Sequence, residues 1–436
     1  MRNWWDGIPA LVQDLLLSGL FLLPLIGLGV VLLRRFAPWP LVRGILWRFR
    51  WPNVLFVLLI AISVGMGIGL IAQERGLRQG TAQAADKFDM VISAPGSELT
   101  MMLAAVFLQP TDVPMVDGPT YADIANHDRI AFAAPIGFGD SYAGHPIVGT
   151  IADFISHLTE SGVEGRVWEQ SGEAVVGALV RLEIGDRFEP AHGIGFTAEV
   201  GGHDGEELVV VGRMPRTGSP WDKAILIPIE TVWEVHGLPN GHPFEEQGQI
   251  GPPFDPAYFP GTPAVIVRAE SLAATYALRT EFTRENETMA FFPGTVLANL
   301  YSVMGDIRQA MSLMSIVTQV LVAISVLLGL FILSRLFQRQ VAMLRALGAP
   351  RRFVMAVVWL YGVVLLGVGT ALGLVFGLIA AAVLSLIVTQ RTGVLVTASL
   401  GWGEVHLALA FLSVTALLSL LPALVVLRQP IAENLR

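Results

Sequence analysis

The sequence predicts an α-helical membrane domain of about five transmembrane helices, carrying an inserted α+β domain outside the membrane on a helical stalk. Hydrophobic residues make up 53% of the 436 residues, too many for a soluble protein, and 15% are charged, too many for a chain buried in lipid throughout. Long uncharged runs gather toward the two ends of the chain. Acidic residues, prolines and short alternating strands gather between them.

The N-terminal segment, residues 1–40, contains an apolar run at residues 11–33 that predicts a first transmembrane helix. The arginines of this region lie mainly after the run, at Arg34, Arg35, Arg43, Arg48 and Arg50. The positive-inside rule then places the N-terminus outside, and this order of charges is the reverse of that in a cleaved signal peptide. Residues 41–74 supply a cytoplasmic segment and a second transmembrane helix at 54–72, just long enough to cross a ~30 Å hydrocarbon core.

Residues 75–305 predict an α+β domain with stalk segments at both ends. Strands are expected at 89–93, 130–138, 147–151, 174–182, 207–211, 224–228 and 264–268, and helices at 121–126 and 272–282. After Pro293 a helical pattern runs to Leu336 and would reach about 65 Å, roughly twice the hydrocarbon thickness. Together with residues 73–86 it predicts a two-legged stalk. Residues 99–108 are either a core helix or an exposed apolar patch.

The last segment, residues 306–436, predicts three transmembrane helices around a short cytoplasmic helix. Apolar runs at 353–389 and 407–426 are each interpreted as a single span. Gly369, Gly373, Gly377 and Ala381 recur every fourth residue. This spacing is typical of a face that packs against another transmembrane helix, although such glycines are also simply tolerated in membrane helices.

A cationic segment at residues 337–354 separates an uncharged run at 312–334 from the apolar run at 353–389. Its arginines, together with Arg335 just before it, place it in the cytoplasm by the positive-inside rule. Apolar residues at helical spacing, followed by Gly348 and Pro350, predict a short amphipathic helix with a defined end. Such a helix suits docking in a groove of another protein. The alternative is a basic connector that only sets topology.

The same segment resembles the coupling segment of FtsX-like ABC permeases, the macrolide-exporter and lipoprotein-release type of the type VII ABC superfamily. The resemblance implies that ATPase-coupling residues are Arg339, Gln340, Val341, Met343, Leu344, Arg345, Ala346, Leu347, Gly348 and Ala349. Gln340 departs from the glutamate that the family generally has there. The string 88–97 and the tail 427–436 are also similar to the family, so the resemblance extends from about residue 41 onward. The extra first helix departs from the usual four.

No catalytic motif is evident in the chain. A nucleotide-binding P-loop needs Gly-Lys-Ser/Thr, and lysine occurs only at Lys87 and Lys223, each preceded by aspartate. The chain is therefore expected to be non-catalytic and without a cofactor, and the resemblance implies that ATP and Mg are bound by a partner ATPase. The absence of cysteine excludes disulfides and thiolate sites. His236, His242, Glu245 and Glu246 are weak metal candidates, and a solvated loop is the alternative.

The resemblance implies a permease subunit of an ABC transporter that transmits ATPase-driven motion across the bacterial inner membrane to a periplasmic domain. Expected partners are a cytoplasmic ABC ATPase, a second copy or a similar permease, and membrane lipid, with a periplasmic adaptor or lipoprotein left open. The cations cluster at the membrane edges, as topology requires, so nucleic acid is not expected as a partner. Lipoprotein, amphiphile, peptide and metal complex remain open as substrates. The alternative function is a membrane-anchored periplasmic sensor or ligand-binding protein without transport.

Overall fold

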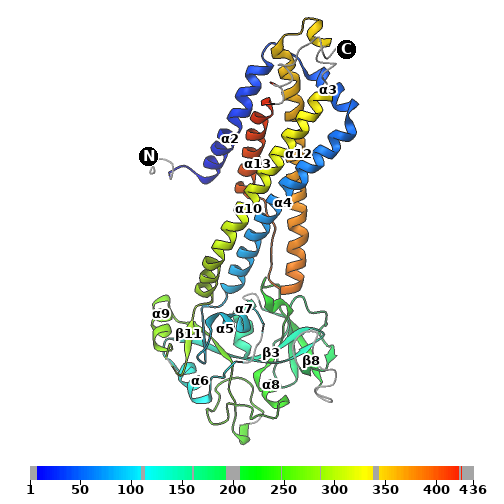
Figure 1. Ribbon diagram of the computed structural model, residues 1–436. Coiled ribbons are helices and arrows are strands. Elements are labelled where there is room, and N and C mark those ends of the chain that lie inside the picture. Colours follow the sequence, from blue (N-terminus) through cyan, green and yellow to red (C-terminus); the bar gives the residue numbers. More distant parts are fainter. Residues whose placement is uncertain are drawn as a thin grey trace. The chain divides into compact units, whose positions relative to one another are not determined.

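The computed structural model describes residues 7–109, 113–159, 162–192, 207–246, 248–284, 286–336, 343–421 and 424 (Figure 1). The chain divides into two compact units. The helical unit consists of Met1–Gly76, Asp306–Ser385 and Thr397–Arg436, and the sheet unit consists of Leu77–Gly305 and Leu386–Val396. The sequence places the α+β domain at residues 75–305 alone, so the inclusion of Leu386–Val396 in the sheet unit is a departure from that expectation.

The helical unit is built from α-helices, most of them long and apolar. They are α2 (Ala10–Leu33), α3 (Trp39–Arg48), α4 (Arg50–Ala85), α10 (Pro293–Leu336), α12 (Arg351–Thr392) and α13 (Trp402–Leu418). By length and composition, α2, α4 and α12 could each cross a membrane. The apolar stretches in α10 (Ile316–Gly329) and in α13 are shorter. Three of the five expected spans are thus long enough among the described residues, and the full count of five stays a prediction.

Three of these helices exceed the thickness of a bilayer and continue across the boundary between the units. Helix α4 has 36 residues, α10 has 44 and α12 has 42. At 1.5 Å per residue, α10 and α12 are each more than about 60 Å long, against a hydrocarbon core of about 30 Å. The proline-free pattern after Pro293 and the apolar run after Arg352 are each one continuous helix.

The sheet unit is organised around one mixed sheet. Its strand order is β11-β1-β10-β2-β3-β9-β5-β8-β4, with β6 beside β8 and β7 beside β2. The strands are β1 (Met90–Ser93), β2 (Ile130–Tyr142), β3 (His145–Thr150), β4 (Glu164–Gly165), β5 (Glu173–Val176), β6 (Arg187–Phe188), β7 (Ala191–His192), β8 (Leu208–Arg213), β9 (Ile225–Pro228), β10 (Ala264–Ala269) and β11 (Met289–Phe291). The pairs β3–β9 and β5–β8 are parallel, and the other pairs are antiparallel.

Short helices connect these strands, and three of them begin at a polar cap. They are α5 (Glu98–Ala105), α6 (Gly118–Ala125), α7 (Ala152–Thr159), α8 (Ile229–Val235), α9 (Leu272–Glu281) and the 3₁₀ turns η2 (Pro220–Lys223) and η3 (Phe244–Glu246). Ser97, Asp117 and Ser271 each accept a hydrogen bond from the backbone N–H three residues later, at 3.0–3.3 Å. These side chains satisfy helix N–H groups that have no carbonyl partner, which fixes where each helix begins.

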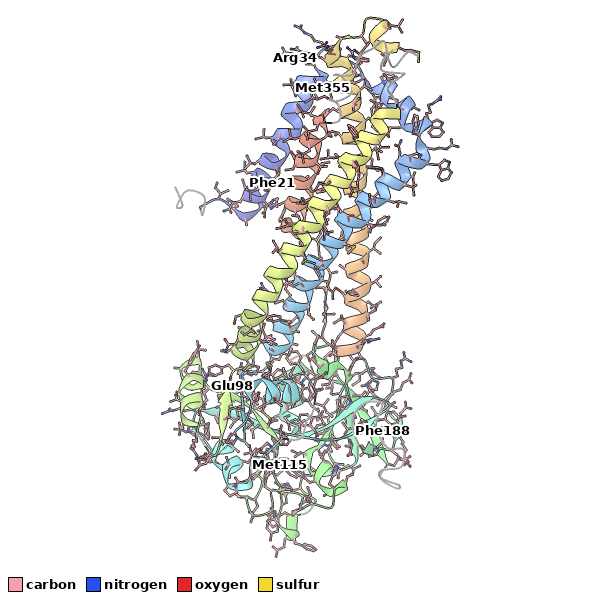
Figure 2. All side chains as sticks on the ribbon, viewed as in Figure 1. Phe21, Arg34, Glu98, Met115, Phe188 and Met355 are labelled. Atoms are coloured by element: carbon pink, nitrogen blue, oxygen red, sulfur yellow. The ribbon has the colours of Figure 1, made fainter. Side chains whose placement is uncertain are left out.

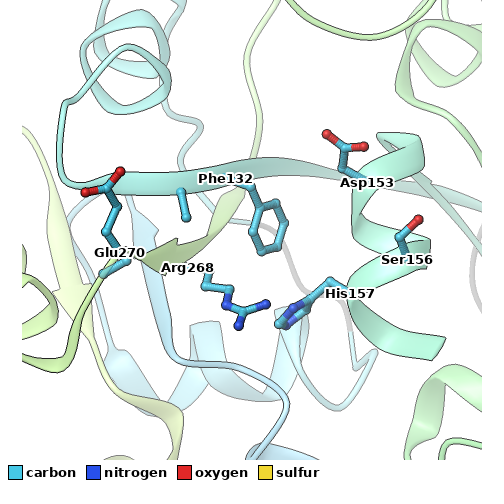
Figure 3. Close-up of a pocket in the computed structure, with 8 residues that line it drawn as sticks. Phe132, Asp153, Ser156, His157, Arg268 and Glu270 are labelled. Atoms are coloured by element: carbon cyan, nitrogen blue, oxygen red, sulfur yellow. The ribbon is translucent and has the colours of Figure 1, made fainter. Parts of the chain in front are cut away.

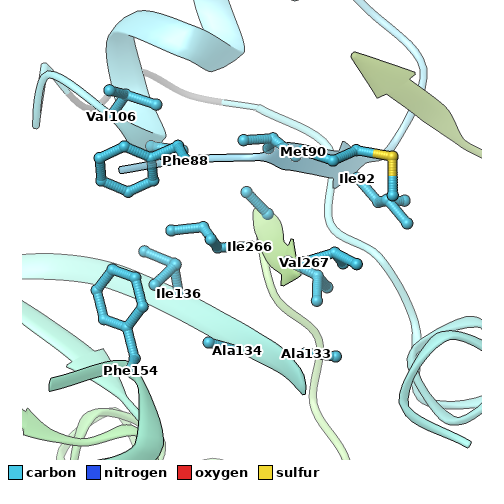
Figure 4. Packing of buried hydrophobic residues seen from close by; sticks show 14 of the residues in the cluster. Phe88, Met90, Ile92, Val106, Ala133, Ala134, Ile136, Phe154, Ile266 and Val267 are labelled. Carbon is cyan, nitrogen blue, oxygen red and sulfur yellow. The ribbon is translucent and has the colours of Figure 1, made fainter. Parts of the chain in front are cut away.

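The core of the sheet unit lies between the sheet and these helices. Phe88, Met90, Ile136, Phe154 and Ile266 are all buried in it (Figure 4). Met101 and Met102 of α5 are 3% and 0% exposed. The apolar segment at residues 99–108 therefore contributes mainly to the core, although Leu99 and Leu103 stay partly exposed.

Candidate functional site

The described part of the coupling segment is a short helical turn with a glycine stop. Residues 343–346 are helical, and Gly348 has φ +93°, a left-handed conformation that glycine adopts without steric cost. The Gly348 N–H donates to the Arg345 carbonyl at 3.1 Å, and the Ala349 N–H donates to the Leu344 carbonyl at 3.0 Å. Such bonds satisfy the last carbonyls of a helix. Arg339, Gln340 and Val341 lie outside the described residues.

Exposure differs sharply within this turn. Leu347 is 86% exposed, the highest value for a large apolar side chain in the described part of the chain, and Met343 is 52% exposed. Leu344, Arg345 and Ala349 are half-buried, whereas Ala346 and Gly348 are exposed. An apolar side chain left in water beside cationic residues is typical of a surface that another protein covers. Leu347 is thus more exposed than Leu344.

Arginines surround the same end of the helical unit. The rings of Phe36, in the turn after α2, and Phe353, at the start of α12, lie 5.8 Å apart. This contact brings the turn that carries Arg34 and Arg35 close to the beginning of α12, where Arg351 and Arg352 are exposed. Figure 2 shows Arg34 and Met355 at this end and Phe21 farther along α2. The clustering of cations is the pattern expected of a cytoplasmic face.

The four-residue repeat in α12 lies against α4. A Cβ added at Gly369 would lie 2.7 Å from the Ile60 Cβ, and one at Gly373 would lie 2.8 Å from the Val64 Cβ. A Cβ at Gly377 would lie 2.8 Å from the Gly65 carbonyl oxygen. These distances are too short for any larger residue, so the two backbones approach closely along this glycine seam. Ala381 follows at 1% exposure.

Polar side chains add specific contacts between the same helices. The Tyr361 hydroxyl of α12 donates to the Asn53 Oδ1 of α4, and the Asn53 amide donates to the Leu46 carbonyl of α3 at 3.0 Å. The Trp359 indole N–H donates to the Ala416 carbonyl of α13 at 3.0 Å. In an apolar medium such bonds fix which helices pack together, because an unpaired polar group would be costly.

An ion pair with a fully buried carboxylate and a partly exposed guanidinium joins α4 to the beginning of α13. The Arg75 guanidinium donates to the Glu404 carboxylate, whose side chain is 0% exposed. The Gly401 N–H donates to the other Glu404 oxygen at 3.1 Å. Sequence reasoning missed this pair because its members are 329 residues apart. The only available signal was an arginine and a glutamate at opposite edges of apolar runs, where charged residues are often functional.

The extra N-terminal helix packs within the helical unit. His406 of α13 donates from Nε2 to the Asp14 carbonyl of α2 at 3.1 Å, and its ring lies 5.8 Å from the Phe21 ring. A Cβ at Gly29 would lie 3.3 Å from the Trp359 ring. Helix α2 is therefore an integral part of this unit and packs on both α12 and α13.

The four weak metal candidates do not form one site. His236 donates from Nδ1 to the Val232 carbonyl at 2.7 Å, and its Nε2 lies 3.8 Å from Asp140. His242 faces Glu230 rather than Glu245, with 3.7 Å between Nε2 and Oε1. Within the described residues, no group of three or more metal-ligating His, Asp or Glu side chains is present. The spacing along the loop did not indicate how its side chains would be arranged.

The Glu230–His242 pair is buried and incompletely hydrogen-bonded. The two residues are 2% exposed, and Glu230 Oε1 accepts from the Gly251 N–H at 2.5 Å. Glu230 Oε2 and both His242 ring nitrogens have no hydrogen-bond partner among the described residues. Burial raises the pKa of Glu230 to about 7 and lowers the pKa of His242, because each charged form loses its hydration.

A surface groove of about 470 Å³ lies on the sheet unit where α7 meets the ends of β2 and β10 (Figure 3). Phe132, Asp153, His157, Arg268 and Glu270 line it, so its charge is mixed. His157 donates from Nε2 to the Lys87 carbonyl at 2.6 Å. Because a carbonyl oxygen can only accept, Nε2 is the nitrogen of this ring that carries the proton in that bond.

Comparison with known proteins identifies the C-terminal part of the chain. Residues 312–431 match the family described as FtsX-like permease C-terminal. No curated protein matches the chain. Among solved structures, the chain is similar to the periplasmic region of MacB from Actinobacillus actinomycetemcomitans at 9% identity and a TM-score of 0.30, covering 50% of this chain and 95% of that one. Residues 312–431, less than half of the chain, are therefore similar to the C-terminal domain of FtsX-like permeases.

Proposed function

We propose that the chain is the permease subunit in which a separate cytoplasmic ATPase drives motion of the sheet unit, outside the bacterial inner membrane. The observation that carries this proposal is the exposed turn at residues 343–349. It leaves Leu347 uncovered at the cationic end, between α10, which ends at Leu336, and α12, which begins at Arg351. Motion imposed there would enter two rigid helices at once, and rigid elements with two arrangements are what mechanical coupling requires.

The ATPase would supply all nucleotide chemistry, binding ATP and Mg. The chain itself has only two lysines, Lys87 and Lys223, and neither stands in a phosphate-binding motif. The residues of this chain would bind the partner subunits, position the helices and transmit their movement to the sheet unit. A second copy or a similar permease would complete the assembly, and a periplasmic adaptor or lipoprotein is compatible with this role. The cargo would be a lipoprotein, amphiphile, peptide or metal complex presented to the sheet unit, with no route through the bilayer needed.

The direct test is the composition of the complex. The tagged chain is purified from native membranes in mild detergent, and subunits that accompany it are identified by mass spectrometry and by ATP hydrolysis. The expected result is a soluble subunit that hydrolyses ATP. Recovery of the chain with no such subunit, or with a kinase instead, would refute the transporter role and favour a membrane-anchored sensor.

Two variants locate the contact. Leu347→Asp places a charge where the partner would cover an apolar side chain, and should reduce recovery of the ATPase subunit at least about tenfold, since an unpaired buried charge costs several kcal/mol. Leu347→Met keeps the apolar surface and should retain the subunit. Leu238→Asp, at a 45% exposed leucine of the sheet unit, controls for an added surface charge and should also retain it.

A further inference from the structure

The end of α12 belongs to the sheet unit. Residues Leu386–Val396, the last turns of α12 and the segment that follows, cluster with Leu77–Gly305 rather than with the other transmembrane helices. The same helix begins at Arg351, directly after the exposed turn at residues 343–349, which we call the coupling turn. A single α-helix of 42 residues therefore starts next to the surface proposed for the ATPase and ends inside the sheet unit.

Hydrogen bonds tie this end of α12 to the loop that leads into η2. The Leu395 N–H donates to the Gly218 carbonyl at 3.1 Å, and the Lys223 ammonium donates to the Gln390 carbonyl. The turn itself is fixed by Thr389, whose carbonyl accepts from Gly393 at 2.9 Å and whose hydroxyl accepts from Val396 at 3.0 Å. The Leu395–Gly218 bond joins backbone atoms on both sides, so this part of the contact does not depend on side-chain conformation.

The segment at the end of α12 also packs closely against its neighbours in the sheet unit. Gly393 has φ +78°, and a Cβ there would lie 2.8 Å from the Pro220 Cα. A Cβ at Gly80, in the last turns of α4, would lie 3.2 Å from the Val394 side chain. Val394 and Val396 are 3% and 4% exposed. Only glycine fits at positions 80 and 393 without a shift of the neighbouring backbone, which indicates a packed contact rather than a loose crossing.

The loop that receives α12 is firmly held. Asp222 is 1% exposed and accepts from the Thr217 N–H at 2.7 Å and from the Gly218 N–H at 3.0 Å. Trp221 is fully buried, with its ring 4.8 Å from Phe154 and 6.1 Å from Phe88. A displacement of this loop would therefore be passed into the main core of the sheet unit, next to β1 and α7.

We propose that α12 is a third mechanical link into the sheet unit, beside the stalk helices α4 and α10, with Gly393, Leu395 and Lys223 as positioning residues. The contact of residues 390–396 with Gly218–Lys223 stays closed while the protein works. Because this role rests on the proposed ATPase coupling, its test compares variants with a wild-type complex that responds to ATP.

The absence of native cysteine allows a clean crosslink. A Cβ at Gly218 would lie 3.5 Å from the Leu395 Cβ, within the range for a disulfide. In the Gly218→Cys/Leu395→Cys double variant, the reduced protein is the control for the oxidised one. The readout is amide hydrogen exchange of the sheet unit with and without ATP, in the complex with its ATPase. The oxidised protein should keep the ATP response of the reduced one within about twofold.

Breaking the contact should have the opposite effect. Gly393→Val collides with Pro220 and should lower the ATP response of the sheet unit at least about fivefold while the ATPase stays bound. Gly144→Val is the matched control, because Gly144 has φ +82° but nothing within 4 Å. A wild-type response in Gly393→Val, or a response abolished by the crosslink, would overturn the third link. A wild-type complex without any ATP response would instead refute the proposed function.

Discussion

Different kinds of residue pack inside the helical unit and inside the sheet unit. In the sheet unit, large side chains such as Trp221, Phe154 and Phe291 are fully buried. In the helical unit, large side chains such as Ile62 and Val375 are at least half exposed, and glycines fill the seam between α4 and α12. The hydrophobic effect can hold the first arrangement together in water, whereas lipid removes that driving force from the second.

This difference shows where function can be placed in each unit. The helical unit depends on close backbone approach and on a few buried polar pairs, so a small change at Arg75 or Gly373 alters which helices touch. The sheet unit can tolerate surface change because its core is large and apolar. The proposed conversion of helix movement into movement of the sheet unit would use this division, because helix contacts could rearrange while the sheet-unit core stays packed.

The largest effect is expected at the buried ion pair of the helical unit. Arg75→Leu leaves the buried Glu404 carboxylate without its partner and should cost roughly 3–5 kcal/mol of stability, measured by unfolding in detergent and followed by circular dichroism. The double variant Arg75→Leu/Glu404→Leu should regain most of this. Equal losses in the single and double variants would show that packing, not charge, holds α13 to α4.

The sheet unit supplies the matched comparison for that pair. Arg187 and Glu207 also form an ion pair, at 2.7 Å, but their side chains are 64% and 48% exposed. Arg187→Leu should therefore cost less than about 1 kcal/mol, because solvent already screens the charges. A loss as large as that of Arg75→Leu would erase the contrast between the two units.

A pH effect is expected in the sheet unit. Because burial raises the pKa of Glu230 to about 7, the folded state holds this proton more tightly than the unfolded chain does. The stabilisation is fully present below the ordinary pKa of glutamate and is lost as the pH rises through about 7, by roughly 3 kcal/mol. Glu230→Gln should flatten this fall, measured by tryptophan fluorescence of unfolding. An exposed control, Glu270→Gln, should keep the wild-type profile, and an unchanged profile in Glu230→Gln would contradict the assignment.

A smaller effect is expected at the glycine seam. Gly373→Leu forces a side chain into a space where a Cβ alone lies 2.8 Å from the Val64 Cβ, and should destabilise the helical unit by roughly 1–3 kcal/mol. Gly367→Leu lies on the same helix with nothing within 4 Å, so it should change little. Unfolding in detergent, with the sheet unit as internal reference, measures both. Equal stability of the two variants would contradict a stabilising role for close packing at Gly373.

Local patterns predicted several of the elements, whereas the strand expected at 174–182 ends at Val176. The strand expected at 89–93 is β1 (Met90–Ser93), and the helix expected at 272–282 is α9 (Leu272–Glu281), because alternation and helical spacing are properties of neighbouring residues. Contacts between distant residues could not be predicted in this way. Arg75–Glu404 and Glu230–His242 depend on how the elements pack, and no spacing along one sequence encodes that packing.

Two features of the candidate site were also beyond the sequence. The amphipathic pattern indicated Leu344 as much as Leu347, and only the turn at Gly348 leaves Leu347 exposed. The long apolar run after Arg352 was interpreted as one span ending near residue 389, which is correct for the helix. That its last turns join the sheet unit depends on Gly218 and Pro220, more than 170 residues earlier.

The most direct test of the central claim is the ATP response of the sheet unit when only the coupling turn is changed. Amide hydrogen exchange of β1 and α7 is measured in the reconstituted complex with and without ATP, for the wild-type chain and for Leu347→Asp. The account predicts an ATP-dependent change in the wild type and none in the variant. An equal change in both, or a sheet unit that never responds to ATP, would contradict it.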